Sequence, residues 1–426
     1  MKTAIVGGRL ITPERIIDDG IHCLEDGKIS GIVRGEVPEG AKVIHAGGNY
    51  VSPGFIDLHT HGGGGHDFMD GTAEAVEGAC RAHLVHGTTS LCPTTLTSTD
   101  EELFTFFDCY REAKKHMKNG PDLLGIHMEG PYFSMEQRGA QDPNYLKIPA
   151  EHDYRAMLDR SEDVVRVSAA PELPGALELA DELKRRGILA AIGHSDAVYE
   201  TVAEAWERGY THVTHLYSGM STIRRIQAFR HLGVVESAYL IDGMTVEIIA
   251  DGKHLPPELL RLIVKLKPME DICLITDSMR GAGMADGERV LLGSLAHGQE
   301  CIIDQGVAML PDRSAFAGSV CTADRCVRTM YKDAGVRLQD AVRMMTLNPA
   351  RVLGIEKQKG SLSAGKDADV VIFDDCVNIK QVIVGGVSVY TAQRPPKMKQ
   401  KNVPGAGETA PGTFFPCSRK LTPAAI

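Results

Sequence analysis

The stretch Gly54-Phe55-Ile56-Asp57-Leu58-His59-Thr60-His61-Gly62 decides the fold and much of the chemistry of this chain. It reads as an apolar strand that ends in His-x-His. Because successive side chains of a strand point to opposite faces, His59 and His61 lie on the same face. Two neighbouring imidazoles can bind a metal ion, although two polar residues at a strand end would give the same pattern. The rest of the chain has to distinguish these readings.

Four further apolar segments each end at a potential metal ligand, which makes coincidence a poor explanation. The segments are 123–129 (LLGIHME), 188–194 (ILAAIGH), 212–215 (HVTH) and 272–277 (ICLITD). Imidazole and carboxylate groups together suit Zn²⁺, Fe²⁺, Mn²⁺ or Co²⁺. We therefore predict a divalent metal site whose ligands are His59, His61, Glu129, His194, His215 and Asp277.

Short apolar runs alternate with helical stretches through the middle of the chain. Eight candidate strands begin near residues 54, 88, 123, 164, 188, 212, 245 and 272, and helices are expected at 73–86, 101–117, 176–186 and 197–208. Repeated strand–helix units predict an α/β fold with a parallel (β/α)8 TIM-like barrel. Functional groups of such barrels lie at the C-terminal ends of the strands. All six predicted ligands fall at such ends.

Both ends of the barrel region are flanked by β-rich sequence. Residues 1–53 and 360–390 contain short β-type runs separated by Gly and Asp-Gly turns, and we expect them to pair into one small β-sandwich. Residues 54–359 would form the barrel domain. Residues 391–426 are rich in Pro, Lys, Gly and Ser, which predicts a flexible tail without chemistry.

Composition narrows the class of partner. The 426 residues are 43% hydrophobic and 24% charged, as in ordinary globular proteins, and the net charge of −10 offers no basic surface for nucleic acid or anionic lipid. No run approaches the roughly 20 apolar residues of a membrane span. Ten scattered cysteines without a paired framework favour reduced thiols. We expect a cytoplasmic protein that acts on a small molecule.

Specific motifs add a family resemblance. They are DLHTHGGGG (57–65), GTTSLCPT (87–94), HMEGPYF (127–133), IGHS (192–195), VTHLYSGM (213–220), ADGKH (250–254), ITDS (275–278), FAGS (316–319), NPARVLG (348–354) and GSLSAGKDADVVIFD (360–374). Over about residues 1–390 the chain resembles the N-acetylglucosamine-6-phosphate deacetylases of the amidohydrolase superfamily. The resemblance implies hydrolysis of N-acetyl-D-glucosamine 6-phosphate to D-glucosamine 6-phosphate and acetate, in amino sugar catabolism. It also implies a homodimer in which a neighbour completes the phosphate pocket.

The resemblance implies roles for the predicted ligands. Glu129, His194 and His215 would hold the principal metal ion. His59 and His61 match the position at which some family members bind a second ion, and Glu129 would bridge the two. Asp277 matches the catalytic aspartate, which accepts a proton from the attacking water and delivers it to the leaving amine.

For the substrate, the resemblance implies phosphate contacts from Arg230 and His254. The remaining substrate-binding positions that it implies are Ala140, Gln141, Ser218, Gly219, Phe316, Ala317 and Gly318.

This chain departs from the family pattern around the substrate. Gln141 stands where the family often has His, and Ser218-Gly219 stands for the usual Asn-Ala. The usual Arg-Glu-Pro-Gly is Arg-His-Leu-Gly at 230–233, after about four extra residues that include the basic pair Arg224-Arg225. That pair is an alternative phosphate contact.

The departures leave other readings open. The substrate could be N-acetylgalactosamine 6-phosphate, an unphosphorylated N-acyl sugar or an N-acyl-D-amino acid. A hydantoinase is disfavoured, because its bridging Lys comes from the fourth strand and segment 164–172 contains none. A non-catalytic scaffold or sugar-binding module would have no need of the full set of ligands and general base.

Overall fold

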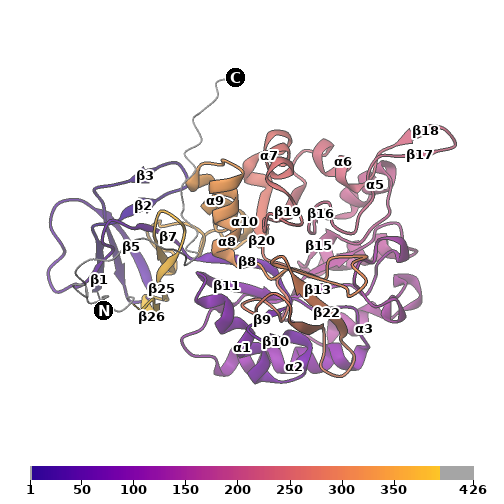
Figure 1. Cartoon of the computed structure of the whole chain (residues 1–426), viewed down its shortest axis with the longest axis horizontal. Helices are drawn as coiled ribbons and strands as arrows, with labels where there is room; N and C mark the ends of the chain where they lie inside the picture. Colours follow the sequence, from indigo (N-terminus) through magenta and orange to yellow (C-terminus); the bar gives the residue numbers. More distant parts are fainter. Residues whose placement is uncertain (1, 394–426) are drawn as a thin grey trace, which may run out of the picture.

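The computed structural model describes residues 2–393 and contains the predicted barrel (Figure 1). Its eight strands are β8 (Phe55–Thr60), β11 (Thr88–Pro93), β13 (Ile126–Glu129), β14 (Val164–Ala169), β15 (Leu189–Ile192), β16 (Tyr210–Val213), β19 (Thr245–Ile249) and β20 (Ile272–Ile275). β8 pairs in parallel with β11, and the strands from β13 to β20 pair in parallel in chain order. After β20, the backbone N–H of Asp277 donates to the carbonyl of His59 at 2.9 Å. This bond joins the last strand to the first, and the predicted fold class is confirmed.

One helix follows each barrel strand. These helices are α1 (Ala73–Leu84), α2 (Asp100–His116), α3 (Tyr154–Asp159), α4 (Ala176–Arg186), α5 (Tyr199–Arg208), α6 (Val234–Leu240), α7 (Pro257–Leu266) and α8 (Ala323–Arg328), with α9 (Leu338–Met344) and α10 (Leu347–Val352) after them. α1 begins where the Thr72 side chain accepts from the backbone N–H of Ala75 at 3.1 Å, a typical N-cap. The four helices expected from the sequence lie close to their predicted bounds. Within residues 2–393, no helix is both long and apolar enough to cross a membrane.

Both ends of the chain build a β-sandwich beside the barrel (Figure 1). One sheet contains β1 (Lys2–Val6), β4 (Ile21–Glu25), β5 (Lys28–Val33) and β6 (Lys42–His45). The other contains β2 (Arg9–Ile11), β3 (Ile16–Ile17), β7 (Tyr50–Pro53), β24 (Val370–Phe373), β25 (Ile379–Val384) and β26 (Val387–Thr391). β24 pairs antiparallel with β7, with Val370 opposite Pro53, so the two ends meet in one sheet.

The exact domain bounds at 53/54 and 359/360 remain predictions. The tail predicted at 391–426 begins inside β26, and its residues from 394 onward lie outside the described residues. Among the described residues, no disulfide bond joins the cysteines from Cys23 to Cys376.

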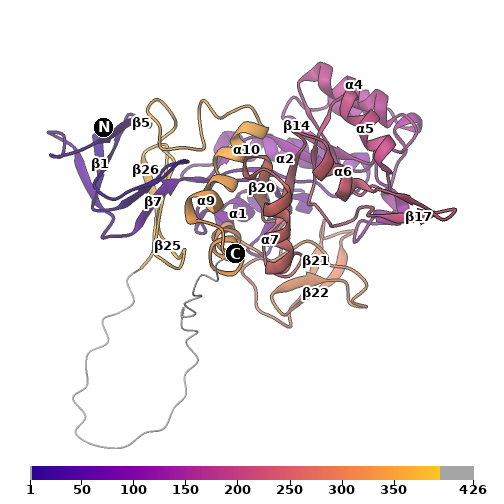
Figure 2. The ribbon, with the colours of Figure 1, turned by 90° about the horizontal axis from the view of Figure 1, so that it is seen from above.

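A hairpin and a small sheet beside the barrel were not expected from the sequence. β17 (Arg224–Ile226) and β18 (Phe229–His231) form a hairpin that projects from the barrel, away from the sandwich (Figures 1 and 2). β21 (Arg289–Leu292), β22 (Gln299–Asp304) and β23 (Val307–Met309) form a small antiparallel sheet between β20 and α8. The apolar face of this sheet packs Val290, Cys301 and Ile303 on Met279, close to the C-terminal end of β20. We call residues 289–309 the insert sheet.

Buried His22 on β4 predicts a loss of stability in acid. It is fully buried and, among the described residues, neither ring nitrogen has a hydrogen-bond partner. Burial lowers its pKa from 6.5 to about 4. As pH falls below about 6.5, the unfolded chain therefore binds a proton that the folded chain does not. We expect the free energy of unfolding of metal-free protein to fall between pH 6.5 and 4, by about 3 kcal/mol at about 1.36 kcal/mol per pKa unit.

Chemical denaturation at pH 7 and at pH 4.5 checks this expectation. His22→Leu should reduce the pH dependence, whereas His116→Leu, at a side chain that is 56% exposed, should leave it unchanged. An unaltered pH dependence in His22→Leu would show that another group is responsible.

Candidate active site

The six predicted ligands all lie at the C-terminal end of the barrel. His59 is on β8 and His61 directly follows it, Glu129 ends β13, and His194, His215 and Asp277 each lie two residues beyond a strand. The last three have left-handed backbone conformations, with φ of 47°, 29° and 47°. Such φ values are uncommon outside glycine and cluster at functional sites, where the surrounding structure holds them.

Glu129 lies at the centre of the cluster. Its Oε1 is 2.9 Å from Nε2 of His215 and 3.4 Å from Nε2 of both His194 and His59, and its Oε2 is 3.3 Å from Nε2 of His61. Two groups of three potential ligands result, and both include Glu129. In each group the ligand atoms lie within 4.8 Å of one another. The geometry therefore brings together two half-sites that share a carboxylate.

Asp277 completes the cluster beside His59 and His61. Its Oδ1 lies 3.2 Å from Nε2 of His61 and 3.5 Å from Nε2 of His59. Burial raises the pKa of the Asp277 carboxyl, but the charges of His59 and His61 outweigh this and hold it below its usual range. Burial also raises the pKa of Glu129, and the neighbouring imidazoles bring it well below the usual value. Both carboxyls are therefore ionised at neutral pH.

The donor set fits a divalent metal. Burial lowers the pKa of His59, yet Glu129 and Asp277 raise it to about 10. The Nε2 atoms of His59 and His61 face each other at 3.2 Å. Buried imidazoles and carboxylates converging in this way concentrate lone pairs at one point, which a cation can satisfy. The backbone carbonyls of Gln137 and Ser218 lie 2.9 and 3.1 Å from Nδ1 of His194 and His215, so the Nε2 atoms are directed inward.

A cavity of about 320 Å³ opens above this cluster. The predicted site residues that line it are His61, Glu129, Ala140, Gln141, His194, His215, Ser218, Gly219, His254, Asp277, Phe316 and Gly318. Three others do not: His59 is fully buried, Ala317 is buried against the insert sheet, and Arg230 is exposed on β18. The lining residues that sequence reasoning missed include Leu96, Tyr217 and Leu292. They carry no signal that separates them from ordinary core residues.

Gln141 is held in one orientation. Its Oε1 accepts from the backbone N–H and the hydroxyl of Thr97 at 2.9 and 3.0 Å, and its Nε2 donates to Oε2 of Glu129 at 2.8 Å. The amide NH₂ is therefore directed at the ligand cluster. This neutral donor stands where the family often has a charged or chargeable imidazole.

His254 faces the cavity from the loop after β19. Its Nδ1 lies 2.8 Å from Oδ2 of Asp251, and Oδ1 of the same carboxylate accepts from the backbone N–H groups of Lys253 and His254. The Phe316 ring lies 4.6 Å from the His254 ring and is 43% exposed. Among residues 2–393, no group forms a hydrogen bond with the second nitrogen of His254, which leaves it available for a ligand. An anionic group bound there would lie beside an exposed aromatic face.

The Ser218-Gly219 departure has a structural reason. Gly219 has a φ of 55°, and a Cβ built on it would lie 2.7 Å from Nδ1 of His194 and 2.7 Å from the carbonyl of Gln137. A side chain at this position would displace a predicted ligand. Glycine therefore allows the backbone to approach His194 closely.

The hairpin residues do not reach this cavity within the same chain. Arg230 lies opposite Arg225 across the hairpin and both are exposed, while Arg224 forms an ion pair with Asp196. The three apolar side chains exposed beside them are Ile223 (53%), Ile226 (41%) and Phe229 (73%).

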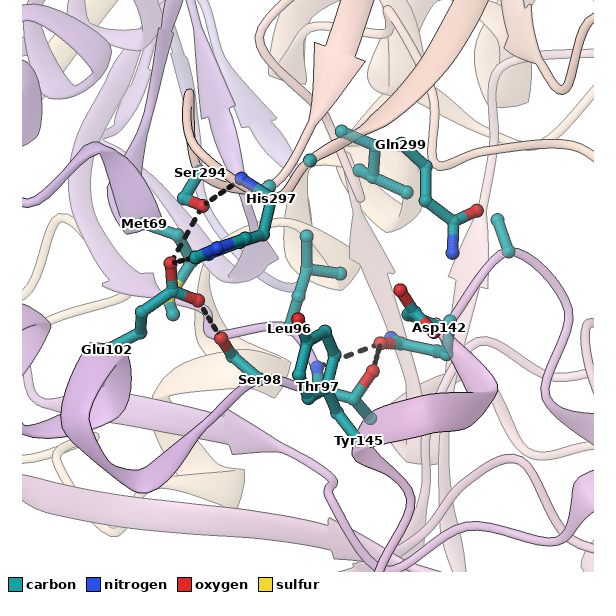
Figure 3. Close-up of a pocket in the computed structure, with 15 residues that line it drawn as sticks. Met69, Leu96, Thr97, Ser98, Glu102, Asp142, Tyr145, Ser294, His297 and Gln299 are labelled. Atoms are coloured by element: carbon teal, nitrogen blue, oxygen red, sulfur yellow. Dashed lines mark hydrogen bonds and ion pairs between the residues drawn. The ribbon is translucent and has the colours of Figure 1, made fainter.

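A second, smaller pocket (Figure 3) shares the lining residues Leu96, Ala140, Gln141 and Leu292 with this cavity. There Glu102 on α2 lies 2.8 Å from Nδ1 of His297 and accepts from the Ser294 hydroxyl at 3.0 Å. Both partners lie in the loop between β21 and β22. The contact thus links the insert sheet to α2, and the arrangement contains no hydroxyl aligned with an imidazole for nucleophilic chemistry.

Comparison with known proteins identifies the family. The amidohydrolase family model matches residues 50–389. The chain belongs to the amidohydrolase family. An N-acetylglucosamine-6-phosphate deacetylase of Lysinibacillus sphaericus is 32% identical over 371 residues, which cover 85% of this chain and 91% of that protein. An N-acetylgalactosamine-6-phosphate deacetylase of Escherichia coli O157:H7 is also 32% identical, over 381 residues that cover 89% of this chain and 97% of that one.

The same relationship appears in three dimensions. The crystal structure of an N-acetylglucosamine-6-phosphate deacetylase from Pasteurella multocida has a TM-score of 0.84 and 28% identity, covering 91% of this chain and 99% of that one. The resemblance expected from the motifs is confirmed. The metal-dependent chemistry of the family also agrees with the ligand cluster at the barrel end.

Proposed function

We propose that this protein hydrolyses N-acetyl-D-glucosamine 6-phosphate to D-glucosamine 6-phosphate and acetate. The observation that carries the proposal is the convergence of four imidazoles and two carboxylates beneath a cavity of about 320 Å³. The named relatives act on N-acetyl sugar phosphates, and their similarity extends over most of this chain. The reaction is one step in the catabolism of amino sugars.

Glu129, His194 and His215 would hold one divalent ion, and His59 and His61 with Glu129 a second. Zn²⁺, Fe²⁺, Mn²⁺ and Co²⁺ all suit these ligands. Such an ion supplies Lewis-acid polarisation and lowers the pKa of a water molecule from about 15.7 to about 7.

Asp277 acts as the proton carrier. As water attacks the acetyl carbon, an Oδ atom of Asp277 accepts the proton that the water releases. The new bond is C–O, and the C–N bond then breaks while Asp277 returns the proton to the leaving nitrogen. The products are a free amine and acetic acid, which releases its proton to solvent as acetate. Gln141, whose amide NH₂ is directed inward, donates to the oxygen of the acetyl group as negative charge develops there.

The sugar phosphate is held farther out in the cavity. The available nitrogen of His254 binds the phosphate, while the backbone at Ser218, Gly219 and Gly318 lines the sugar. The Phe316 ring completes this side. The hydrogen bond that Nδ1 of His254 donates to Asp251 fixes which nitrogen of His254 faces the ligand.

Acetate release by metal-loaded protein tests the proposal. N-acetylglucosamine 6-phosphate, its galactosamine epimer and unphosphorylated N-acetylglucosamine should be compared side by side. We expect the first to have the highest kcat/KM. Preference for the epimer or for an unphosphorylated sugar would transfer the assignment to that substrate, and release from none of them would contradict it.

The exposed hairpin supports a homodimer. Ile223, Ile226 and Phe229 form an apolar surface that a second copy of the chain would bury. Arg230 lies on the same hairpin, and its guanidinium would bind the phosphate in the partner's cavity through two parallel hydrogen bonds. A cytoplasmic location is part of the same proposal, supported by cysteines without a paired framework.

Mixed dimers test whether Arg230 acts across the interface. Arg230→Ala alone should raise KM for the phosphorylated sugar, by about 10-fold or more for a lost charge-assisted contact of about 1.5 to 3 kcal/mol. Exchanging subunits between inactive Asp277→Asn and Arg230→Ala should restore one normal site per mixed dimer. If Arg230 acts within its own chain, mixing restores nothing. Sedimentation of each variant checks that it still dimerises.

A further inference from the structure

A buried ion pair lies beneath the ligand cluster, inside the barrel. Arg166 on β14 and Glu247 on β19 are both fully buried, and their side chains form a salt bridge. A buried pair of this kind contributes little stability compared with well-packed apolar residues. The role of the pair is therefore sought in the groups that it contacts. A charged residue in the middle of an apolar strand is the sequence signal that could have identified both.

One oxygen of Glu247 contacts both half-sites. Its Oε2 lies 3.3 Å from Nδ1 of His59 and accepts from the backbone N–H of His215, also at 3.3 Å. When a carboxylate accepts from Nδ1 of an imidazole, the proton stays on that nitrogen and Nε2 is free to bind a metal. Glu247 thus directs Nε2 of His59 toward the cluster.

Arg166 keeps Glu247 in place. Beyond the salt bridge, its guanidinium donates to the carbonyl of Leu58 at 3.3 Å and to the hydroxyl of Thr214 at 3.0 Å. These groups adjoin His59 and His215 in the sequence. The guanidinium thus spans the barrel interior from β14 to β8 and to the end of β16, and it fixes the carboxylate relative to both half-sites.

The two half-sites depend on Glu247 to different degrees. His194 and His215 each have a backbone carbonyl at Nδ1, from Gln137 and Ser218. His59 has only the Glu247 carboxylate at that nitrogen among the described residues. Loss of the carboxylate would therefore release the His59 ring and leave the other two imidazoles oriented.

We propose that Glu247, held by Arg166, is a positioning residue that sets the affinity of the His59–His61 half-site for its ion. The inference relies on the proposed function only for the metal centre, and it does not depend on the sugar. The other half-site keeps its affinity without Glu247.

Metal titration of the metal-free protein tests this. Binding of Mn²⁺ and of Co²⁺ to the wild type and Glu247→Gln is followed by calorimetry, with ion content measured after dialysis and the visible spectrum recorded for Co²⁺. We expect one of two ions to bind 10- to 100-fold more weakly in the variant, the usual effect of losing such a partner. In the variant, the visible absorption bands of Co²⁺ in the weakened half-site should be absent when one equivalent of Co²⁺ has been added.

The double variant Arg166→Met/Glu247→Leu removes both charges at once, so no buried charge is left unpaired and folding is preserved. It should show the same selective loss. Lys267→Met is the matched control, because it removes a buried cation that donates to the carbonyl of Ala238 at 2.9 Å, outside the ligand cluster. This variant should lower Tm without changing the affinity for either ion.

Three results would overturn the proposal. The variants could bind both ions more weakly to the same extent, they could bind both ions as the wild type does, or the wild type could bind a single ion. Failure of the wild type to release acetate from any N-acetyl sugar would contradict the proposed function and leave the titration interpretable.

Discussion

Asp277→Asn should lower kcat for acetate release by about 10²- to 10⁴-fold, the range that general acid–base groups contribute. The amide is nearly the same size as the carboxylate but cannot accept the proton of the attacking water. The four imidazoles and Glu129 remain, so the variant should still bind metal. KM should change little, because the Asp277 carboxyl adjoins the imidazoles and not the phosphate end of the cavity.

Steady-state kinetics with metal content measured on the same sample checks this result. Asp142→Asn is the matched control, since Asp142 lies outside the ligand cluster and its Asn replacement keeps an acceptor for the backbone N–H of Asn144. Near-normal turnover of metal-loaded Asp277→Asn would exclude Asp277 as the proton carrier. Loss of metal together with activity would show that Asp277, one of the six predicted ligands, is needed to hold the metal.

The barrel and its ligand cluster could be predicted because their signals are local. Each apolar strand stops at one polar residue, and the barrel topology brings those ends together. The positions of His194, His215 and Asp277 two residues beyond their strands follow from left-handed backbone conformations, which no propensity scale indicates for these residue types.

Other features depend on contacts distant in the sequence and could not be predicted. The hairpin at 224–231 and the insert sheet consist of strands of three to six residues, too short for a clear periodicity. Arg230 matched a family motif, yet the extra residues before it place it on an exposed hairpin. Motif matching located the residue but not the cavity that it serves.

Glu129→Gln should abolish binding of both ions and, with it, acetate release. Glu129 is the only residue that the two groups of potential ligands at the barrel end share; the third such group among residues 2–393, Asp122, Asp367 and Asp369, does not include it. Its carboxylate also balances the surrounding imidazoles, and removing one partner of a buried charged pair typically costs about 3 to 5 kcal/mol. We expect each ion to bind at least about 100-fold more weakly, since losing a ligand costs no less than losing an outer partner.

Ion content after dialysis measures this effect, with Glu182→Gln as the control. Glu182 is 7% exposed and pairs with Arg185 and Arg186 on α4, outside the ligand cluster, so its loss should lower stability alone. The measured ion content then distinguishes the roles of Glu129, Glu247 and Asp277. Both ions are lost without Glu129, one is weakened without Glu247, and neither is lost without Asp277. Retention of one tightly bound ion in Glu129→Gln would show that Glu129 belongs to a single half-site and does not bridge.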